Sequence, residues 1–293
     1  MNKFTDKELF KKCLDRISHN ASRLERIRIM EVCGTHTMEI GRSGLRSILP
    51  ENIELISGPG CPVCVTPGSI IDTACDLSLK GPVILTFGDM IRVPGNRGSL
   101  EHAQSNGGKV EAILTPLHAI AIAKENPGKT FIFIAAGFET TIPAIARTVE
   151  IADEQKIDNL FFLVAHRTVP PALSALIQDK EVSIDGFLLP GHVCAITGLA
   201  PFSAVLDKKY PSVVTGFEAL DIIMSIMMIT DMLVEGRAET VNMYRRVARD
   251  YGNPLAVRLI ERVFKPVDAV WRGIGTIPQS GLALNDEYVK FDA

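Results

Sequence analysis

The sequence predicts an α/β protein with two similar lobes of parallel sheet flanked by helices, facing each other across a cleft, plus a helical appendage. Three observations predict this fold class. Short runs rich in β-branched residues alternate with helical patterns, which is typical of α/β folds. Most of these runs are continuously apolar, as expected for parallel strands covered on both faces. Within each lobe the runs begin roughly 25–30 residues apart, about the length of a βαβ unit.

Six runs are expected to form strands, in two groups of three: residues 26–32, 53–57 and 83–87, then residues 130–135, 160–164 and 186–189. The first run alternates arginine with isoleucine, which favours a position at the edge of a sheet. Helical patterns follow most of the runs, among them residues 141–153 and 171–179. Beyond Pro201 three more helices are expected, over residues 216–234, 238–250 and 254–264.

These elements predict three parts of the chain. The first lobe is expected over residues 26–110 and carries the loops of Cys33 and of the Cys61/Cys64 pair. The second lobe is expected over residues 111–200 and carries the loops of Glu139 and His192. Residues 1–25 together with 201–293 are expected to form the helical appendage.

The composition excludes several classes of protein. The chain has 293 residues, of which 46% are hydrophobic, so it can bury a core and is not disordered. Its net charge of −3 gives no basic surface for nucleic acid or an anionic membrane. The most apolar stretch, residues 217–234, is interrupted by three acidic side chains and is not expected to span a bilayer. No signal-peptide core is present, so a cytoplasmic location is expected.

The expected strand ends carry an unusual set of reactive side chains. In doubly wound sheets, ligands bind beyond the carboxyl ends of the strands. Here those positions are occupied by thiols, imidazoles, a carboxylate and hydroxyls, in the loops CGTHT (33–37), GPGCPVCVTPG (58–68), GFETT (137–141), AHR (165–167) and PGHVC (190–194). The sequence therefore predicts that both lobes contribute to one chemical site.

The two cysteine motifs have more than one interpretation. Cys61 and Cys64 are separated by two residues, so a single turn brings both sulfurs within reach of a disulfide or of one metal ion. The same spacing suits half of a zinc knuckle or two unrelated buried thiols. Cys33 and His36 are a soft thiolate and an imidazole at one strand end, which suits iron, copper or zinc. They are equally well explained as a small buried residue and a hydrogen-bonded loop residue.

The remaining candidates have structural explanations as well. Thr140 or Thr141 is a candidate N-cap of the following helix, and Glu139 favours the positive end of that helix. His192 follows a Pro-Gly turn signal. No phosphate-binding glycine loop or other nucleotide motif follows any expected strand.

Taken together, six stretches resemble the HypD family, which acts in the maturation of nickel–iron hydrogenases. They are MEVCGTHT (30–37), ISGPGCPVCVTP (56–67), GFETT (137–141), AHRTVPPAL (165–173), PGHV (190–193) and WRGIGTIPQSGL (271–282). The resemblance extends over nearly the whole chain. It implies a metallochaperone scaffold on which iron receives its cyanide and carbon monoxide ligands, rather than an enzyme with free small-molecule turnover.

The resemblance also implies partners and residue roles. A small HypC-type chaperone would share the iron, and a HypE-type partner would donate the cyanide. Cys33 would be the iron ligand, and Cys61 and Cys64 the redox-active pair. The site would be lined by ligand-orienting or proton-handling groups, namely His36, Glu139, Thr140 and His192.

One feature departs from the family pattern. Family members normally continue into a segment whose four cysteines bind a four-iron–four-sulfur cluster, but no cysteine follows Cys194 in this sequence. The expectation is therefore a piece of a longer protein or a natural short form, and the departure concerns electron delivery through Cys61 and Cys64. Two other functions stay open: a thiol–disulfide oxidoreductase that uses only this pair, and an inactive module that docks partners.

Overall fold

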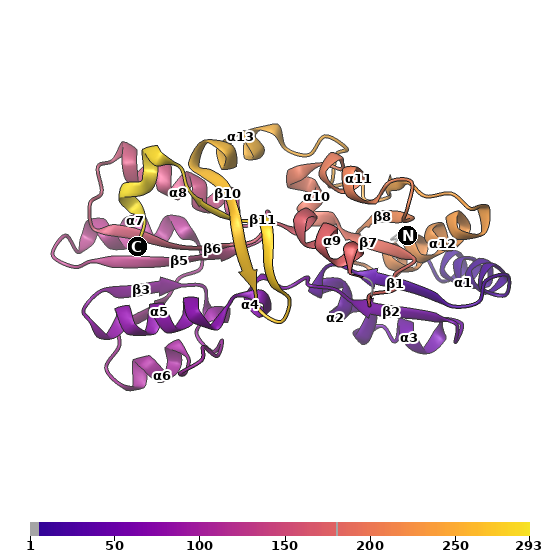
Figure 1. The fold of residues 1–293 in the computed structure, drawn as a ribbon, viewed down its shortest axis with the longest axis horizontal. Helices are drawn as coiled ribbons and strands as arrows, with labels where there is room; N and C mark the ends of the chain where they lie inside the picture. The colour runs from indigo at the N-terminus through magenta and orange to yellow at the C-terminus, as the bar shows by residue number, and fades with distance from the viewer. Residues whose placement is uncertain (1–5, 180) are drawn as a thin grey trace. The chain divides into compact units, whose positions relative to one another are not determined.

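The computed structural model describes residues 6–179 and 181–293 as two compact units of parallel sheet and helices. The first unit comprises Met1–Cys61 and Ala172–Pro254, and the second comprises Pro62–Pro171 and Leu255–Ala293. The predicted fold class, α/β with two lobes, is confirmed (Figure 1).

The first unit is built on a five-stranded sheet in the order β2-β1-β7-β8-β9, in which all neighbours are parallel. Its strands are β1 (Ile27–Glu31), β2 (Ile53–Ser57), β7 (Gly186–Pro190), β8 (Ser212–Thr215) and β9 (Thr240–Asn242). The central strands β7 and β8 are buried along their whole length, as parallel strands covered on both faces are. Its helices are α1 (Lys7–Ala21), α2 (Gly34–Arg42), α3 (Leu45–Ile48), α10 (Gly191–Thr197), α11 (Ala200–Leu206) and α12 (Ala219–Glu235), together with most of α9 (Val169–Gln178).

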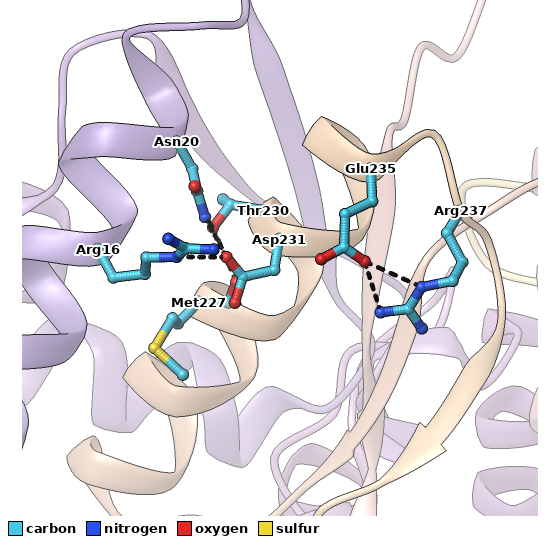
Figure 2. A network of polar contacts seen from close by, with 7 residues as sticks. All are labelled: Arg16, Asn20, Met227, Thr230, Asp231, Glu235 and Arg237. Carbon is cyan, nitrogen blue, oxygen red and sulfur yellow. Dashed lines mark hydrogen bonds and ion pairs between the residues drawn. The ribbon is translucent and has the colours of Figure 1, made fainter.

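The long helix α12 packs against α1 along an apolar seam (Figure 1). Met224, Met227 and Met228 belong to this seam as partly buried side chains, so the methionine-rich stretch is part of the core. Polar side chains also connect α1 with α12. Arg16 and Asn20 of α1 both donate to Asp231 of α12, at 2.7 and 2.6 Å (Figure 2). No helix in the described part of the chain, α12 included, is long and apolar enough to cross a membrane.

The second unit is built on a four-stranded parallel sheet in the order β4-β3-β5-β6. Its strands are β3 (Val83–Thr86), β4 (Val110–Ala112), β5 (Phe131–Gly137) and β6 (Leu160–His166). An antiparallel hairpin of β10 (Phe264–Trp271) and β11 (Gly275–Leu284) contacts β6. The helical elements are α4 (Pro62–Val65), α5 (Gly68–Leu79), η2 (Gly88–Met90), α6 (Leu100–Ser105), α7 (Pro116–Glu125), α8 (Ile142–Glu154), α13 (Pro254–Val263) and η3 (Asp286–Phe291).

All six predicted strands are present, but they are grouped differently from the prediction. The third predicted strand, β3, pairs with β5 in the second unit, and the sixth, β7, pairs with β1 in the first. The predicted lobes at residues 26–110 and 111–200 therefore differ from the observed units, since the chain leaves the first sheet after β2 and returns to it at β7. Pairing between strands so far apart in sequence follows from tertiary packing and not from a local pattern.

Two further expectations are corrected. The first strand is not at an edge, because β1 lies between β2 and β7, where Arg28 pairs with Glu54 of β2 at 3.2 Å. The C-terminal part is not purely helical. It contributes β8 and β9 to the first sheet and the β10–β11 hairpin to the second unit, and residues 238–250 form β9 and turns where a helix was expected.

Candidate functional site

The first unit gathers Cys33, His36, Cys61 and His192 at the carboxyl ends of neighbouring strands. Cys33 follows β1, the Cys61 loop follows β2, and His192 stands in the first turn of α10 after β7. Because β2, β1 and β7 are adjacent and parallel, these loops emerge at the same edge of the sheet. The sheet order therefore places the loops of these four residues at one edge of the first sheet.

The loops of Cys33 and Cys61 pack against each other through their backbones. The amide of Gly34 donates to the carbonyl of Gly60 at 3.1 Å. A Cβ atom added to Gly34 would lie 3.8 Å from the Cβ of Cys61. Cys33 is half-buried and is the N-cap residue of α2, with extended backbone and no side-chain capping bond. The positive end of a helix dipole suits a negatively charged ligand such as a thiolate.

His36 is fully buried one turn into α2. Its Nε2 lies 3.0 Å from the carbonyl oxygen of Gly216 and must donate to it, since a carbonyl only accepts. Burial lowers the pKa of His36 to about 4, so the imidazole is neutral at neutral pH. Its Nδ1 then carries a lone pair that is buried without a hydrogen-bond partner. His192, in contrast, is exposed.

A buried carboxylate that the sequence reasoning missed supports the Cys33 loop. Glu31 is the last residue of β1, is fully buried, and accepts from Arg46 at 2.8 Å and from Ser57 at 2.8 Å. It also accepts from Thr37 of α2 at 3.3 Å. Glu31 thus ties β2 and α2 to the strand end that carries Cys33, and its place within the MEVCGTHT stretch was the available signal.

The second unit carries the other three predicted residues, Cys64, Glu139 and Thr140. Cys64 is exposed on the short helix α4, and Thr140 is exposed after β5. Thr141 is the N-cap residue of α8, although its side chain makes no capping bond. The unit boundary falls between Cys61 and Pro62, so the two cysteines of the C-x-x-C motif belong to different units.

Glu139 is buried, and its side chain has one hydrogen bond. Its Oε1 accepts from the amide of Val169 at 2.8 Å, while its Oε2 is buried without a partner. Burial raises the pKa of Glu139 to about 7. Near neutral pH a large fraction of this side chain is therefore a protonated acid that can donate a hydrogen bond, which is a property suited to proton handling.

The β10–β11 hairpin contacts both the end of β6 and the turn of Cys64. The buried guanidinium of Arg167 donates twice to the carbonyl of Val270, at 3.1 and 2.8 Å. At the tip of the hairpin, the amide of Arg272 donates to the carbonyl of Val65, next to Cys64, at 2.9 Å. The hairpin thus connects the end of β6 with the turn of Cys64. Arg167 was visible only as part of the AHRTVPPAL stretch.

Comparisons with known proteins identify the family of the chain. A family model described as "HypD: Hydrogenase formation hypA family" matches residues 8–293. The chain belongs to this family. A putative hydrogenase expression/formation protein of Methanocaldococcus jannaschii is 41% identical over 293 residues, which cover 100% of this chain and 82% of the relative.

Two bacterial relatives are also similar to this chain over nearly its whole length. The hydrogenase maturation factor HypD of Escherichia coli is 41% identical over 290 residues, covering 98% of this chain and 78% of the relative. HypD of Cupriavidus necator is 35% identical over 304 residues, covering 100% of this chain and 80% of the relative. Similarity along the full chain matches the spread of the six recognised stretches from residue 30 to 282.

The described residues do not form a complete metal site by themselves. Within 6–179 and 181–293, no three side chains of His, Cys, Asp or Glu are arranged to hold a metal ion. A resident four-iron cluster requires four thiolates, and no such group of cysteines lies together among the described residues. The residues present therefore do not fit that cluster.

Glu139→Gln is expected to change how stability depends on pH. Burial raises the pKa of the Glu139 carboxyl from 4.5 to about 7. This shift stabilises the folded chain fully below about pH 4.5, and the stabilisation is lost as the pH rises through about 7. The loss is at most about 3 kcal/mol, at 1.36 kcal/mol per pKa unit. The free energy of unfolding should therefore fall less between about pH 5 and pH 8 in Glu139→Gln than in the parent chain.

Urea unfolding at both pH values measures this difference. The buried histidines titrate in both chains alike, so their contribution cancels. Glu125→Gln, an exposed position on α7, is the control and should follow the parent chain. Identical pH dependence in the parent chain and Glu139→Gln would contradict the elevated pKa.

Proposed function

We propose that this chain is a maturation scaffold on which the Fe(CN)2CO unit of a nickel–iron hydrogenase is assembled. The iron is cargo that the scaffold shares with a small HypC-type chaperone, and a HypE-type partner supplies the cyanide. The observation that carries the proposal is the position of Cys33. Cys33 is the half-buried N-cap residue of α2 and lies beside the Cys61 loop, at the ligand-binding edge of a parallel sheet.

Cys33 serves as the one iron ligand from this chain. A thiolate is a soft donor that suits iron, and the end of α2 favours its negative charge. A single donor fits a site completed by a cysteine of the chaperone and by the diatomic ligands. It also agrees with the lack of a three-residue metal group in the described part of the chain.

The other predicted site residues of the two units have distinct roles in the proposal. The neutral imidazole of His36 is an acceptor at Nδ1, because its Nε2 is committed to Gly216. The protonated fraction of Glu139 is a proton donor. Thr140 and His192 are exposed and orient incoming ligands by hydrogen bonding. Cys61 and Cys64 are the redox-active thiol pair of the proposal.

Infrared spectroscopy with iron quantitation tests the proposal. The chain is purified without oxygen after co-production with its small chaperone, as the parent and as Cys33→Ala. Cyanide and carbonyl bands are expected in the parent and are expected to vanish in Cys33→Ala. The control is Cys75→Ala, which removes a half-buried thiol from α5 and should keep the bands.

Two outcomes would favour the other functions. A parent chain that binds the chaperone but holds no iron and shows no bands would be a docking module. Reduction of insulin that depends on Cys61 and Cys64 but not on Cys33 would make it a thiol–disulfide oxidoreductase.

A further inference from the structure

One aromatic side chain of the first unit contacts both His36 and His192. Phe217, in the loop between β8 and α12, stacks on His36 with ring centroids 4.7 Å apart and planes 23° apart. It also stacks on His192, with centroids 4.1 Å and planes 28° apart. Near-parallel rings at these separations attract each other. The orientation of both imidazoles therefore depends on this ring.

The ring of Phe217 is itself held in place. Tyr244 meets it edge-on, with centroids 5.9 Å apart. The guanidinium of Arg246 lies 4.5 Å from the centre of the Tyr244 ring and pairs with Asp221 of α12. The preceding residue must be glycine, because a Cβ atom on Gly216 would lie 2.1 Å from Oδ2 of Asp221. The loop is therefore fixed on several sides.

His36 connects the β8–α12 loop with Cys33. The carbonyl of Cys33 accepts from the amide of His36 at 2.9 Å, in the first turn of α2. The imidazole of His36 is bonded to Gly216 and stacked on Phe217, both in the loop after β8. The β8–α12 loop thus anchors the first turn of α2, and with it the N-cap residue Cys33.

We propose that Phe217 is a positioning residue for Cys33. It acts through His36, whose ring it holds against the β8–α12 loop, and it sets the orientation of His192 at the same edge of the sheet. The part that concerns iron rests on the proposed function of Cys33. The part that concerns the position of the thiol does not depend on that function.

Three variants of the full chain test this role. Phe217→Leu removes the ring and keeps an apolar side chain, and Phe217→Tyr restores a ring. Phe202→Leu is the matched control, because Phe202 is fully buried on α11 of the same unit. Phe217 is only half-buried, so Phe217→Leu should fold. If it does not fold, Phe217→Met replaces it with the same expected results.

Three readouts separate positioning from general loosening. The first is the upfield ring-current shift of the His36 and His192 ring protons in nuclear magnetic resonance. The second is the rate at which iodoacetamide alkylates Cys33, followed by mass spectrometry. The third is the iron bound after co-production with the small chaperone.

Phe217→Leu is expected to lose both ring-current shifts, to alkylate several-fold faster at Cys33 and to bind several-fold less iron. Phe217→Tyr should match the parent in all three. Phe202→Leu should lower the melting temperature and leave the three readouts unchanged.

Two results would overturn the proposal. One is loss of the ring-current shifts in Phe217→Leu without any change in alkylation at Cys33. The other is an equal rise in alkylation in Phe202→Leu. If the parent chain holds no iron that depends on Cys33, the proposed function fails, and the alkylation rates still decide the role of Phe217.

Discussion

Gly60→Ala is expected to destabilise the chain by about 3 kcal/mol, at the upper end of the range for overpacked sites. A Cβ atom at this position would lie 2.0 Å from the carbonyl oxygen of Val32 and 2.6 Å from the Cα of Cys33. These neighbours are backbone atoms, so no side-chain rotation relieves the overlap. The Cys61 loop must then move away from the Cys33 loop, and the hydrogen bond from Gly34 to Gly60 is lost.

Urea unfolding measures the loss of stability in Gly60→Ala, and iodoacetamide alkylation of Cys33 measures the displacement of its loop. Gly41→Ala is the matched control, because Gly41 is exposed on α2 and its Cβ would meet nothing within 4 Å. Its free energy of unfolding should equal the parent value or exceed it by up to about 1 kcal/mol, because alanine favours a helix more than glycine does. Equal stability and equal alkylation in Gly60→Ala and the parent would show that the two loops do not depend on this close approach.

Six strands of the two parallel sheets were predictable because they form apolar runs, whereas β4, β8 and β9 were missed. Parallel strands with helices on both faces are continuous apolar runs, and β5 and β7 are buried at every position. The shorter strands β8 and β9 have four and three residues, too few for a periodic signal. The grouping of strands was not predictable from such runs, since β1 pairs with a strand more than one hundred and fifty residues later in the chain.

The candidate site was predictable to the extent that it follows strand ends. Cys33, Cys61 and His192 follow β1, β2 and β7, and the sheet order places these ends next to one another. Phe217 follows β8, which the sequence did not reveal as a strand, so its contact with both histidines stayed hidden. The burial that raises the pKa of Glu139 depends on tertiary packing, which has no local signature in the sequence.

Arg167→Met is expected to destabilise the second unit by about 3 kcal/mol, because it removes the guanidinium donors of the Val270 carbonyl and of the carbonyl of the fully buried His166. The guanidinium of Arg167 donates to Val270 and to the carbonyl of His166, the latter at 2.7 Å. No carboxylate pairs with it among the described residues, and burial lowers its pKa to about 10. Arg167→Met removes the cost of burying this cation, which by itself would stabilise the unit. The larger effect is that the β10–β11 hairpin loses its hydrogen bonds to the end of β6.

Hydrogen exchange is the most direct measurement of this attachment. Amides of β10 and β11 should exchange faster in Arg167→Met, while those of the first sheet should not change. Arg167→Lys should recover little, since an ammonium cannot reproduce the planar fork of the guanidinium. Arg258→Met, at an exposed position on α13, should stay within about 0.5 kcal/mol of the parent. Unchanged exchange in the hairpin would mean that strand pairing and the stacking of Phe138 on Trp271 hold it without Arg167.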